Sequence, residues 1–331
     1  MTTLQSAVLP AARGPVSATV AEALSAPPAG RVLPLDAIAD ADPFGDDLQL
    51  ALHHCYELHY QGLPGVDAAW EWDPELLRLR AALENRFLAA LRTKVPGGDD
   101  VDGEFAALLV EPIDAPGVSH YLRDEGEWWH VRELFAHRSI YHLKEGDPHA
   151  WVIPRLRGRA KAALVAVEFD EYGAGRADHL HAQLFADLLR GAGLPDGYLA
   201  LLDHTPAPML AIVNAMSMFG LHRSLRGALV GHFAATEITT APSAQRIVQA
   251  LDRLSAPPEC RYFYTEHIEA DSVHEQVMRH DVVGDLLDQE PTLAADVVFG
   301  VQATNLLEDR LTTHLLDSWR TGQSSLRQPL S

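Results

Sequence analysis

Hydrophobic positions recur at helical spacing over most of this chain. From Asp46 onward apolar side chains fill a helix-length window, and a second window opens at Asp73-Pro74, where proline is tolerated in the first helical turn. Turn signals such as Pro257-Pro258 separate the windows that follow. These windows cover residues 103–112, 116–123, 125–143, 153–172, 178–192, 195–203, 208–238, 242–254, 259–287 and 290–321.

The pattern predicts an all-α protein. Residues 164–169 alternate as a strand would, but they lie inside a longer alanine-rich window that favours a helix. No βαβ alternation and no internal repeat are visible, so we expect one helical domain over 46–325, with extra N-terminal helices at 46–95 and the main bundle at 100–325. Closely spaced prolines in 1–45 predict an irregular arm rich in Ala and Pro.

Composition narrows the class of function. The 331 residues include 26 Lys and Arg against 46 Asp and Glu, and the formal net charge of −20 argues against nucleic acid or an anionic membrane as a partner. No apolar run approaches the roughly 20 residues of a membrane span, and the N-terminus shows no leader pattern, so we expect a cytoplasmic protein. Two cysteines, Cys55 and Cys260, are too few for a disulfide framework or a cysteine-type zinc site. A metal would therefore be held by histidine and carboxylate.

The segment 265–274 carries the strongest indication of a metal site. His267, Asp271 and His274 are spaced i, i+4 and i+7, so on a helix they fall within about 60° of one another. One helix face would present two imidazoles and a carboxylate, a set that suits ferrous iron and leaves coordination positions for O2. The competing interpretation is a polar stripe that faces solvent.

Further candidate ligands lie upstream of that segment. Glu171 precedes two glycines that can loosen or break a helix, and His181 begins an apolar-patterned run. An irregular backbone inside a helical region is a common mark of a functional site. Glu145 stands shortly before a proline, and Glu237 closes a long apolar helix, where a carboxylate would be costly to bury without a cation.

Together these segments resemble the haem-oxygenase-like di-iron oxidases and oxygenases, also called iron-containing redox enzymes. The likeness runs from about Asp42 to the last helix and includes Asp-Glu-Tyr-Gly-Ala-Gly-Arg at 170–176. It implies a haem-oxygenase-like helical bundle that binds two Fe(II) ions per chain through seven ligands, at intervals of 26, 10, 56, 30, 4 and 3 residues. The implied ligands are Glu145, Glu171, His181, Glu237, His267, Asp271 and His274.

The resemblance also implies how the ligands are divided between the two irons. Glu145 and a bridging Glu171 would serve one iron, together with one of the two C-terminal histidines. The other iron would be served by His181, Glu237, Asp271 and the second of these histidines. The resemblance leaves open which of His267 and His274 serves which iron.

Histidines beside the implied ligands have plainer interpretations. His142 and His149 flank Glu145, but Pro148 disturbs regular helical geometry there, so we expect neither to bind metal. His232 is interpreted as a core histidine or as a hydrogen-bond donor behind a metal ligand. A packing or surface role is expected for the polar group on the first helix, which consists of His53, His54, Glu57 and His59.

The sequence also suggests which way neighbouring residues point. Only one of Glu168, Asp170 and Glu171 is expected to dominate the inward direction of their helix. His179 should point about 200° away from His181.

The resemblance implies an O2-dependent oxidoreductase. Two carboxylate-bridged ferrous ions can supply electrons to O2 without an organic cofactor, and relatives oxidise amine nitrogens, desaturate or fragment fatty and amino acids, or break C–C bonds. We expect N-oxygenation of a small amine or amino-acid-like substrate, with desaturation or C–C fragmentation as the alternative. The partners are that substrate and O2, and the sequence is compatible with an external electron donor and a homodimer.

Two rival classes share the predicted bundle: an iron-binding or storage protein, and a metal-free enzyme. The irregular stretch at 173–175 argues against the first, and the full ligand set argues against the second.

Overall fold

The computed structural model describes residues 9–110 and 117–330, apart from the side chains of 269–272. Within these ranges the regular elements are helices and there is no strand, so the all-α prediction is confirmed. The ambiguous segment around Leu164 lies in a helix, because Ala160, Leu164, Val167 and Glu171 form one buried face at helical spacing. In the described part of the chain, no helix is both long and apolar enough to cross a membrane.

The chain forms two compact units. Unit 1 contains the described residues up to Lys94 together with 206–217, and unit 2 contains 95–205 together with the described residues from Met218 on. The helices of unit 1 are α1 (Pro15–Leu24), α2 (Asp36–Asp40), α3 (Asp46–Glu57), η1 (Ala68–Trp72), α4 (Pro74–Lys94) and the first part of α11 (Ala207–Leu221).

The N-terminal stretch departs from the expected irregular arm, because α1 lies within it. Pro15 begins this helix in the first turn, where a missing N–H is harmless. The carboxylate of Asp47 accepts hydrogen bonds from the backbone N–H groups of Val16 and Ser17, at 3.0 and 2.7 Å. It thereby satisfies two of the donors that a helix start leaves open. Val20, one turn further on, is buried.

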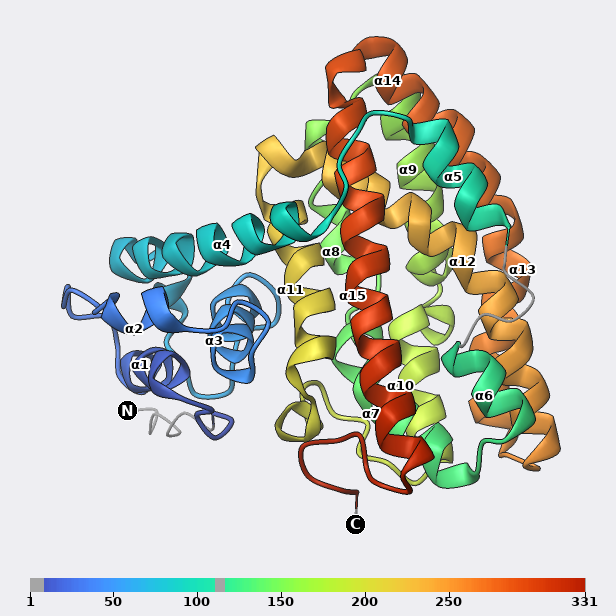
Figure 1. The fold of residues 1–331 in the computed structure, drawn as a ribbon, viewed down its shortest axis with the longest axis horizontal. Coiled ribbons are helices and arrows are strands. Elements are labelled where there is room, and N and C mark those ends of the chain that lie inside the picture. Colours follow the sequence, from blue (N-terminus) through green and yellow to red (C-terminus); the bar gives the residue numbers. More distant parts are fainter. Residues whose placement is uncertain (1–8, 111–116, 331) are drawn as a thin grey trace. The chain divides into compact units, whose positions relative to one another are not determined.

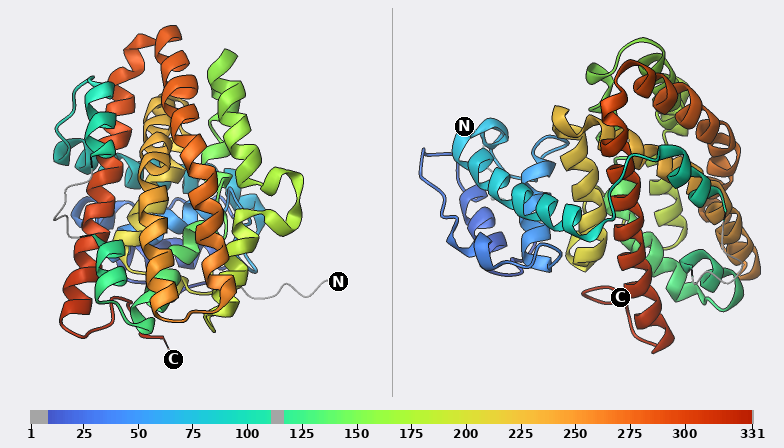
Figure 2. Two further views of the ribbon diagram at one scale, coloured as in Figure 1. Left: turned by 90° about the vertical axis from the view of Figure 1, so that its right-hand side faces the viewer. Right: turned by 45° about the horizontal axis from the view of Figure 1, so that its top comes forward.

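Unit 2 is built around α12 and the helices that pack on it, α13, α15, α5 and α6 (Figure 1). In the left view of Figure 2 the long helix α12 lies between α13 and α15, and it packs on both. The elements of unit 2 are α5 (Val101–Leu109), α6 (Val118–Asp124), α7 (Trp128–His142), α8 (Asp147–Ala150), η2 (Ile153–Arg155), α9 (Gly158–Glu171), η3 (Gly173–Gly175), η4 (Ala177–His179), α10 (His181–Gly191), η5 (Leu202–His204), the end of α11, η6 (Arg223–Leu225), α12 (Arg226–Arg253), α13 (Pro258–Gln276), the π-helical η7 (Val277–Gly284), α14 (Asp285–Gln289), η8 (Pro291–Leu293) and α15 (Ala294–Arg320).

Two glycines set the distance between α12 and α15. A Cβ atom on Gly231 would collide with the backbone of Val297, and a Cβ atom on Gly300 would collide with the backbone of Ala228. The two helices therefore touch backbone to backbone where these glycines cross. Interiors are packed too densely for such a contact to accept an added methyl group without movement.

The boundaries of α12 differ from those that the sequence suggests. The expected windows are 208–238 and 242–254, but α11 ends at Leu221, and α12 runs from Arg226 through Pro242 to Arg253. A proline inside a helix costs about 3 kcal/mol, which the burial of Ile247 and Leu251 on the far side offsets. The sequence analysis expected Glu237 to close a helix, but Glu237 lies in the middle of α12.

Candidate metal centre

Two groups of buried carboxylates and histidines lie inside unit 2. In each group one candidate ligand atom per residue lies within 4.8 Å of the others, and all the side chains are buried. The first cluster consists of Glu145, His181 and His267, and the second cluster consists of Glu171, Glu237 and His274.

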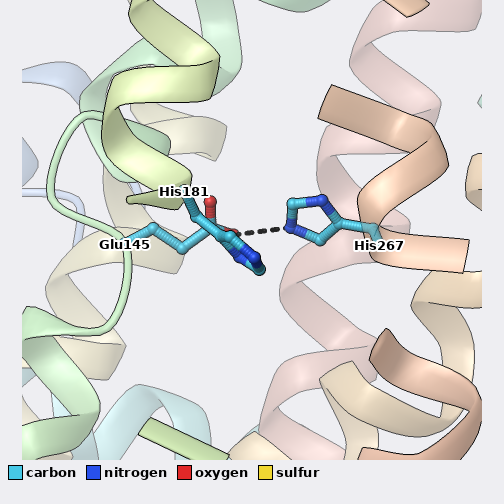
Figure 3. Close-up of side chains that lie close together, drawn as sticks. All are labelled: Glu145, His181 and His267. Carbon is cyan, nitrogen blue, oxygen red and sulfur yellow. Dashed lines mark ion pairs between the residues drawn. The ribbon is translucent and has the colours of Figure 1, made fainter. Parts of the chain in front are cut away.

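The first cluster gathers residues from three separate elements (Figure 3). Glu145 lies in the turn between α7 and α8, His181 is the first residue of α10, and His267 lies on α13. Oε1 of Glu145 is 3.5 Å from Nε2 of His267, and the rings of His181 and His267 have centroids 4.4 Å apart. The three side chains point toward one another, although Glu145 and His267 are 122 positions apart in the sequence.

A backbone contact fixes the orientation of His267. Its Nδ1 lies 2.7 Å from the carbonyl oxygen of Phe263, one turn earlier on α13, so Nδ1–H donates to this carbonyl. The lone pair of the neutral ring is then on Nε2, the atom that faces Glu145. Histidine ligands of metals are commonly oriented in this way, by a hydrogen bond from the nitrogen that does not bind.

The carboxylate of Glu145 is held in its charged form. Nδ1 of His142 lies 2.8 Å from its Oε1. Burial alone would raise the pKa of Glu145, but His142 and His267 hold that pKa well below its ordinary value. Its other oxygen, Oε2, is buried and has no hydrogen-bond partner among the described residues. One oxygen is thus positioned by a neighbour, while the other is open to a ligand.

The second cluster joins α9, α12 and α13. Nδ1 of His274 lies 3.4 Å from Oε2 of Glu237, and its Nε2 lies 3.1 Å from the carboxylate of Asp170. Burial would lower the pKa of His274, but these two carboxylates and Glu171 raise it to about 9. Burial also raises the pKa of Glu237. A metal bound here would displace the proton from Nδ1, because a ligating imidazole nitrogen must be unprotonated.

Glu171 connects the two clusters. Its Oε2 lies 3.0 Å from Nδ1 of His181 in the first cluster, and its Oε1 lies 4.0 Å from Nδ1 of His274 in the second. Between Glu171 and His181 the chain leaves α9 through η3, where Ala174 adopts φ 52° in the left-handed region, and it comes back beside Gly173 at His179. Gly173 allows this turn, because a Cβ atom there would lie 2.5 Å from the carbonyl carbon of His179.

The residue types of both clusters fit iron. Two imidazoles and one carboxylate in the first cluster are the donor set typical of non-haem Fe(II) sites, and the second cluster offers two carboxylates and one imidazole. Several carboxylates in a buried site repel one another unless a cation offsets their charge. Oε2 of Glu237 is buried and faces Nδ1 of His274 at 3.4 Å, without a well-aligned hydrogen bond in the described part of the chain. A metal ion would satisfy both atoms.

The structure brings six of the seven expected ligands together. The seventh, Asp271, lies on α13, but its side chain is outside the described residues. The division between clusters differs from the one that the resemblance implies, because His181 lies with Glu145 and His267, whereas Glu171 lies with Glu237 and His274. This division also separates His267 from His274, which the sequence left open.

Glu168 is a buried residue that the sequence analysis did not single out. It lies one turn before Glu171 on α9 and is 2% exposed, although only one inward carboxylate was expected on this stretch. Burial, followed by the charges of Glu171 and Glu237, raises the pKa of Glu168 to about 9. Spacing of i and i+3 could have revealed the pair, because such residues share one helix face.

The remaining polar candidates lie outside the two clusters. His179 is half-buried on η4, and its Nε2 lies 3.8 Å from Asp178. His142 belongs to neither cluster, as expected, although it contacts the ligand candidate Glu145. The polar group on the first predicted helix consists of His53, His54, Glu57 and His59. All four residues are buried in unit 1, so they have a packing role and not a surface role.

Comparison with known proteins identifies the class that this fold and these clusters define. Residues 132–309, more than half of the chain, match the family described as iron-containing redox enzyme. This range includes both clusters and extends from within α7 to within α15. The chain therefore belongs to the iron-containing redox enzyme family. The prediction of a haem-oxygenase-like helical bundle is confirmed.

One curated relative has a named activity. The nitrosourea synthase of Streptomyces achromogenes subsp. streptozoticus is 24% identical over 166 residues, which is 50% of this chain and 35% of that protein. The chain thus matches about a third of the length of this relative.

Proposed function

We propose that this protein binds two ferrous ions and uses O2 to oxygenate the nitrogen of a small amine or amino-acid-like substrate. The position of Glu171 carries the two-ion part of the proposal. One of its oxygens faces the first cluster and the other faces the second, as a bridging carboxylate requires. The resemblance in the sequence implies the same bridging role.

Each cluster would hold one ion. Glu145, His181 and His267 would hold the first, and Glu171, Glu237 and His274 would hold the second, with Asp271 as a further candidate on α13. Two ferrous ions at these positions would supply electrons for the reduction of O2. The protein contributes the geometry, through His142 behind Glu145, the Phe263 carbonyl behind His267, and Asp170 behind His274.

Tyr141 is a candidate hydrogen-bond donor near the first cluster, because the centroid of its ring lies 4.9 Å from that of His142, which contacts Glu145. Burial, and then the negative charges of Glu145, Glu171 and Glu237, raise its pKa well above the ordinary value. The phenol therefore keeps its proton at neutral pH. A protonated hydroxyl near the reacting atoms can hold or deliver a proton without becoming charged.

The choice of nitrogen as the oxidised atom rests on the relative. Its name says that it makes a nitrosourea, a compound with an oxidised nitrogen. Among the described residues, the candidate ligands in both clusters are histidines and carboxylates. Such hard and borderline donors suit iron that reacts with O2.

Iron titration tests the two-ion part of the proposal. Anaerobic addition of ferrous iron to the metal-free chain should saturate at about two ions per chain, and the loaded protein should consume O2 faster when a suitable amine is present. Saturation at one ion would contradict the bridged pair. Loading of two ions without any amine-dependent O2 consumption would move the protein to the iron-binding class.

Deuterium substitution distinguishes N-oxygenation from desaturation or C–C fragmentation. If nitrogen is the atom oxidised, deuterium on the carbons of the substrate should leave the single-turnover rate nearly unchanged, because no C–H bond breaks. A clear slowing would favour the alternative reactions instead.

A further inference from the structure

Two buried histidines outside the clusters face each other across the interior of unit 2. His149 is 1% exposed and lies on α8, four residues after Glu145. His232 is 3% exposed and lies on α12, five residues before Glu237. Their ring centroids are 5.4 Å apart and their planes are inclined by 38°. Each histidine is thus close in the chain to a carboxylate of one cluster.

The protonation of His232 follows from its neighbours. The hydroxyl of Thr304 donates its hydrogen to the carbonyl oxygen of Gly300, at 2.8 Å, so it can only accept from His232. Nδ1 of His232, 2.8 Å from this hydroxyl, must then carry the ring hydrogen. Nε2 is left with a lone pair, is buried, and has no hydrogen-bond partner among the described residues.

His149 is fixed in orientation but not in hydrogen bonding. Its ring stacks on Phe233, with centroids 4.0 Å apart and planes inclined by 13°, and it lies 6.2 Å from the ring of Tyr141. Both of its ring nitrogens are buried with no partner in the described part of the chain. A neutral imidazole has one donor and one acceptor, so His149 offers both. Leaving such a buried polar atom unsatisfied costs roughly 1–3 kcal/mol.

The charge state of the two rings restricts what they can bind. Burial, followed by His232, lowers the pKa of His149 well below its ordinary value, and burial lowers the pKa of His232 to about 4. Both rings are therefore neutral at physiological pH. Glu145 acts in the opposite direction on the pKa of His149, and Glu308 does so on that of His232, although Glu308 is itself paired with Arg138 at 2.6 Å. Neutral rings with open lone pairs accept an N–H group, whereas a carboxylate has no hydrogen to donate to them.

We propose that His149 and His232 form a binding subsite for an amine group of the substrate, with Nε2 of His232 accepting one of its N–H bonds. This subsite rests on the proposed function, because both take the substrate to be an amine. It places the nitrogen of that amine beside His149 and His232, which lie near Glu145 and Glu237 in the chain. The stacked Phe233 holds the imidazole of His149 against turning, so its open nitrogens keep their direction.

Leucine variants separate binding from structural support. n-Butylamine, with butyrate as the matched anion, is titrated into the full chain, both as isolated and after iron removal, by calorimetry. His149→Leu and His232→Leu should each weaken butylamine binding at least tenfold while keeping or raising Tm, because an unsatisfied buried polar group is removed. His137→Leu is the control. It removes a buried histidine that is bonded to Ser325, and it should lower Tm and leave binding unchanged.

A measurement on the unmodified protein covers the case in which a variant does not fold. In protein with 15N-labelled histidine, the signal of the unprotonated Nε2 of His232 should shift when butylamine is added and stay in place with butyrate. Unchanged amine affinity in both leucine variants, or an Nε2 signal that does not respond, would overturn the proposal. Lower Tm with full amine binding would show a structural pair joined by water, and would overturn it as well.

Failure of the amine subsite can be distinguished from failure of the proposed function. Amine binding to the iron-free chain does not depend on how many ions load. Two ions with no amine effect at His232 would refute the subsite alone, whereas a histidine-dependent amine site with one ion would refute the two-iron reaction alone.

Discussion

Nδ1 of His142 lies 2.8 Å from Oε1 of Glu145, across the turn that follows α7. This contact holds a buried carboxylate in place before any metal arrives, and with His267 it keeps the pKa of Glu145 low. Groups behind a metal ligand typically change metal affinity by roughly 10- to 100-fold when they are lost.

We therefore expect His142→Phe to lower the affinity of the first cluster for ferrous iron by about 10- to 100-fold, as measured by titration. His179→Phe is the matched control, because the half-buried His179 lies outside both clusters. Equal affinity of the His142→Phe and control proteins would show that His142 only packs against Glu145.

Histidine variants should divide by cluster. His181→Ala and His267→Ala should each remove the ion of the first cluster, and His274→Ala should remove that of the second, so that each retains at most about one ion and loses turnover. His54→Ala should keep nearly full iron content, because His54 lies in unit 1. Iron content is measured on folded protein. Iron loss from His54→Ala without unfolding would place the site on other helices.

The close crossing of α12 and α15 predicts a strong effect of one methyl group. Gly231→Ala should destabilise the protein by about 1–3 kcal/mol or more, because the added Cβ atom meets the Val297 backbone, which cannot turn aside as a flexible side chain can. Thermal unfolding measures the change. Gly197→Ala should be tolerated, since its Cβ atom would lie 3.6 Å from that of Ala200. Equal Tm values for the two variants would contradict the crossing.

His54 predicts a pH dependence of stability. Burial, aided by the charge of Arg13, lowers the pKa of His54 from 6.5 to about 4. Between pH 6.5 and 4 the unfolded chain binds a proton at His54 that the folded chain does not. The free energy of unfolding is therefore highest above pH 6.5 and falls as the pH drops toward 4. By linkage, the loss at pH 5 is about 2 kcal/mol. Urea unfolding of His54→Leu should show a shallower decline between pH 7 and 5, and parallel curves would contradict the prediction.

The sequence by itself determined the helices and the residue types of the site. Helical spacing of apolar residues gave α9 in spite of its strand-like alternation, since a helix face depends only on residues a few positions apart. The same local rule put His267 and His274 on one face of α13. It misjudged Glu168, which shares its face with Glu171, and it ended a helical window at 238, whereas α12 continues through Pro242.

Only the tertiary structure decided how the ligands are grouped. His181 joins Glu145 and His267 because the left-handed turn at Ala174 returns the chain toward α9, and because α10 packs on α13. Likewise, Glu237 meets His274 because α12 packs on α13. Periodicity fixes which face of its own helix a side chain takes. It does not fix which faces meet, because that depends on burying apolar surface between segments far apart in the chain.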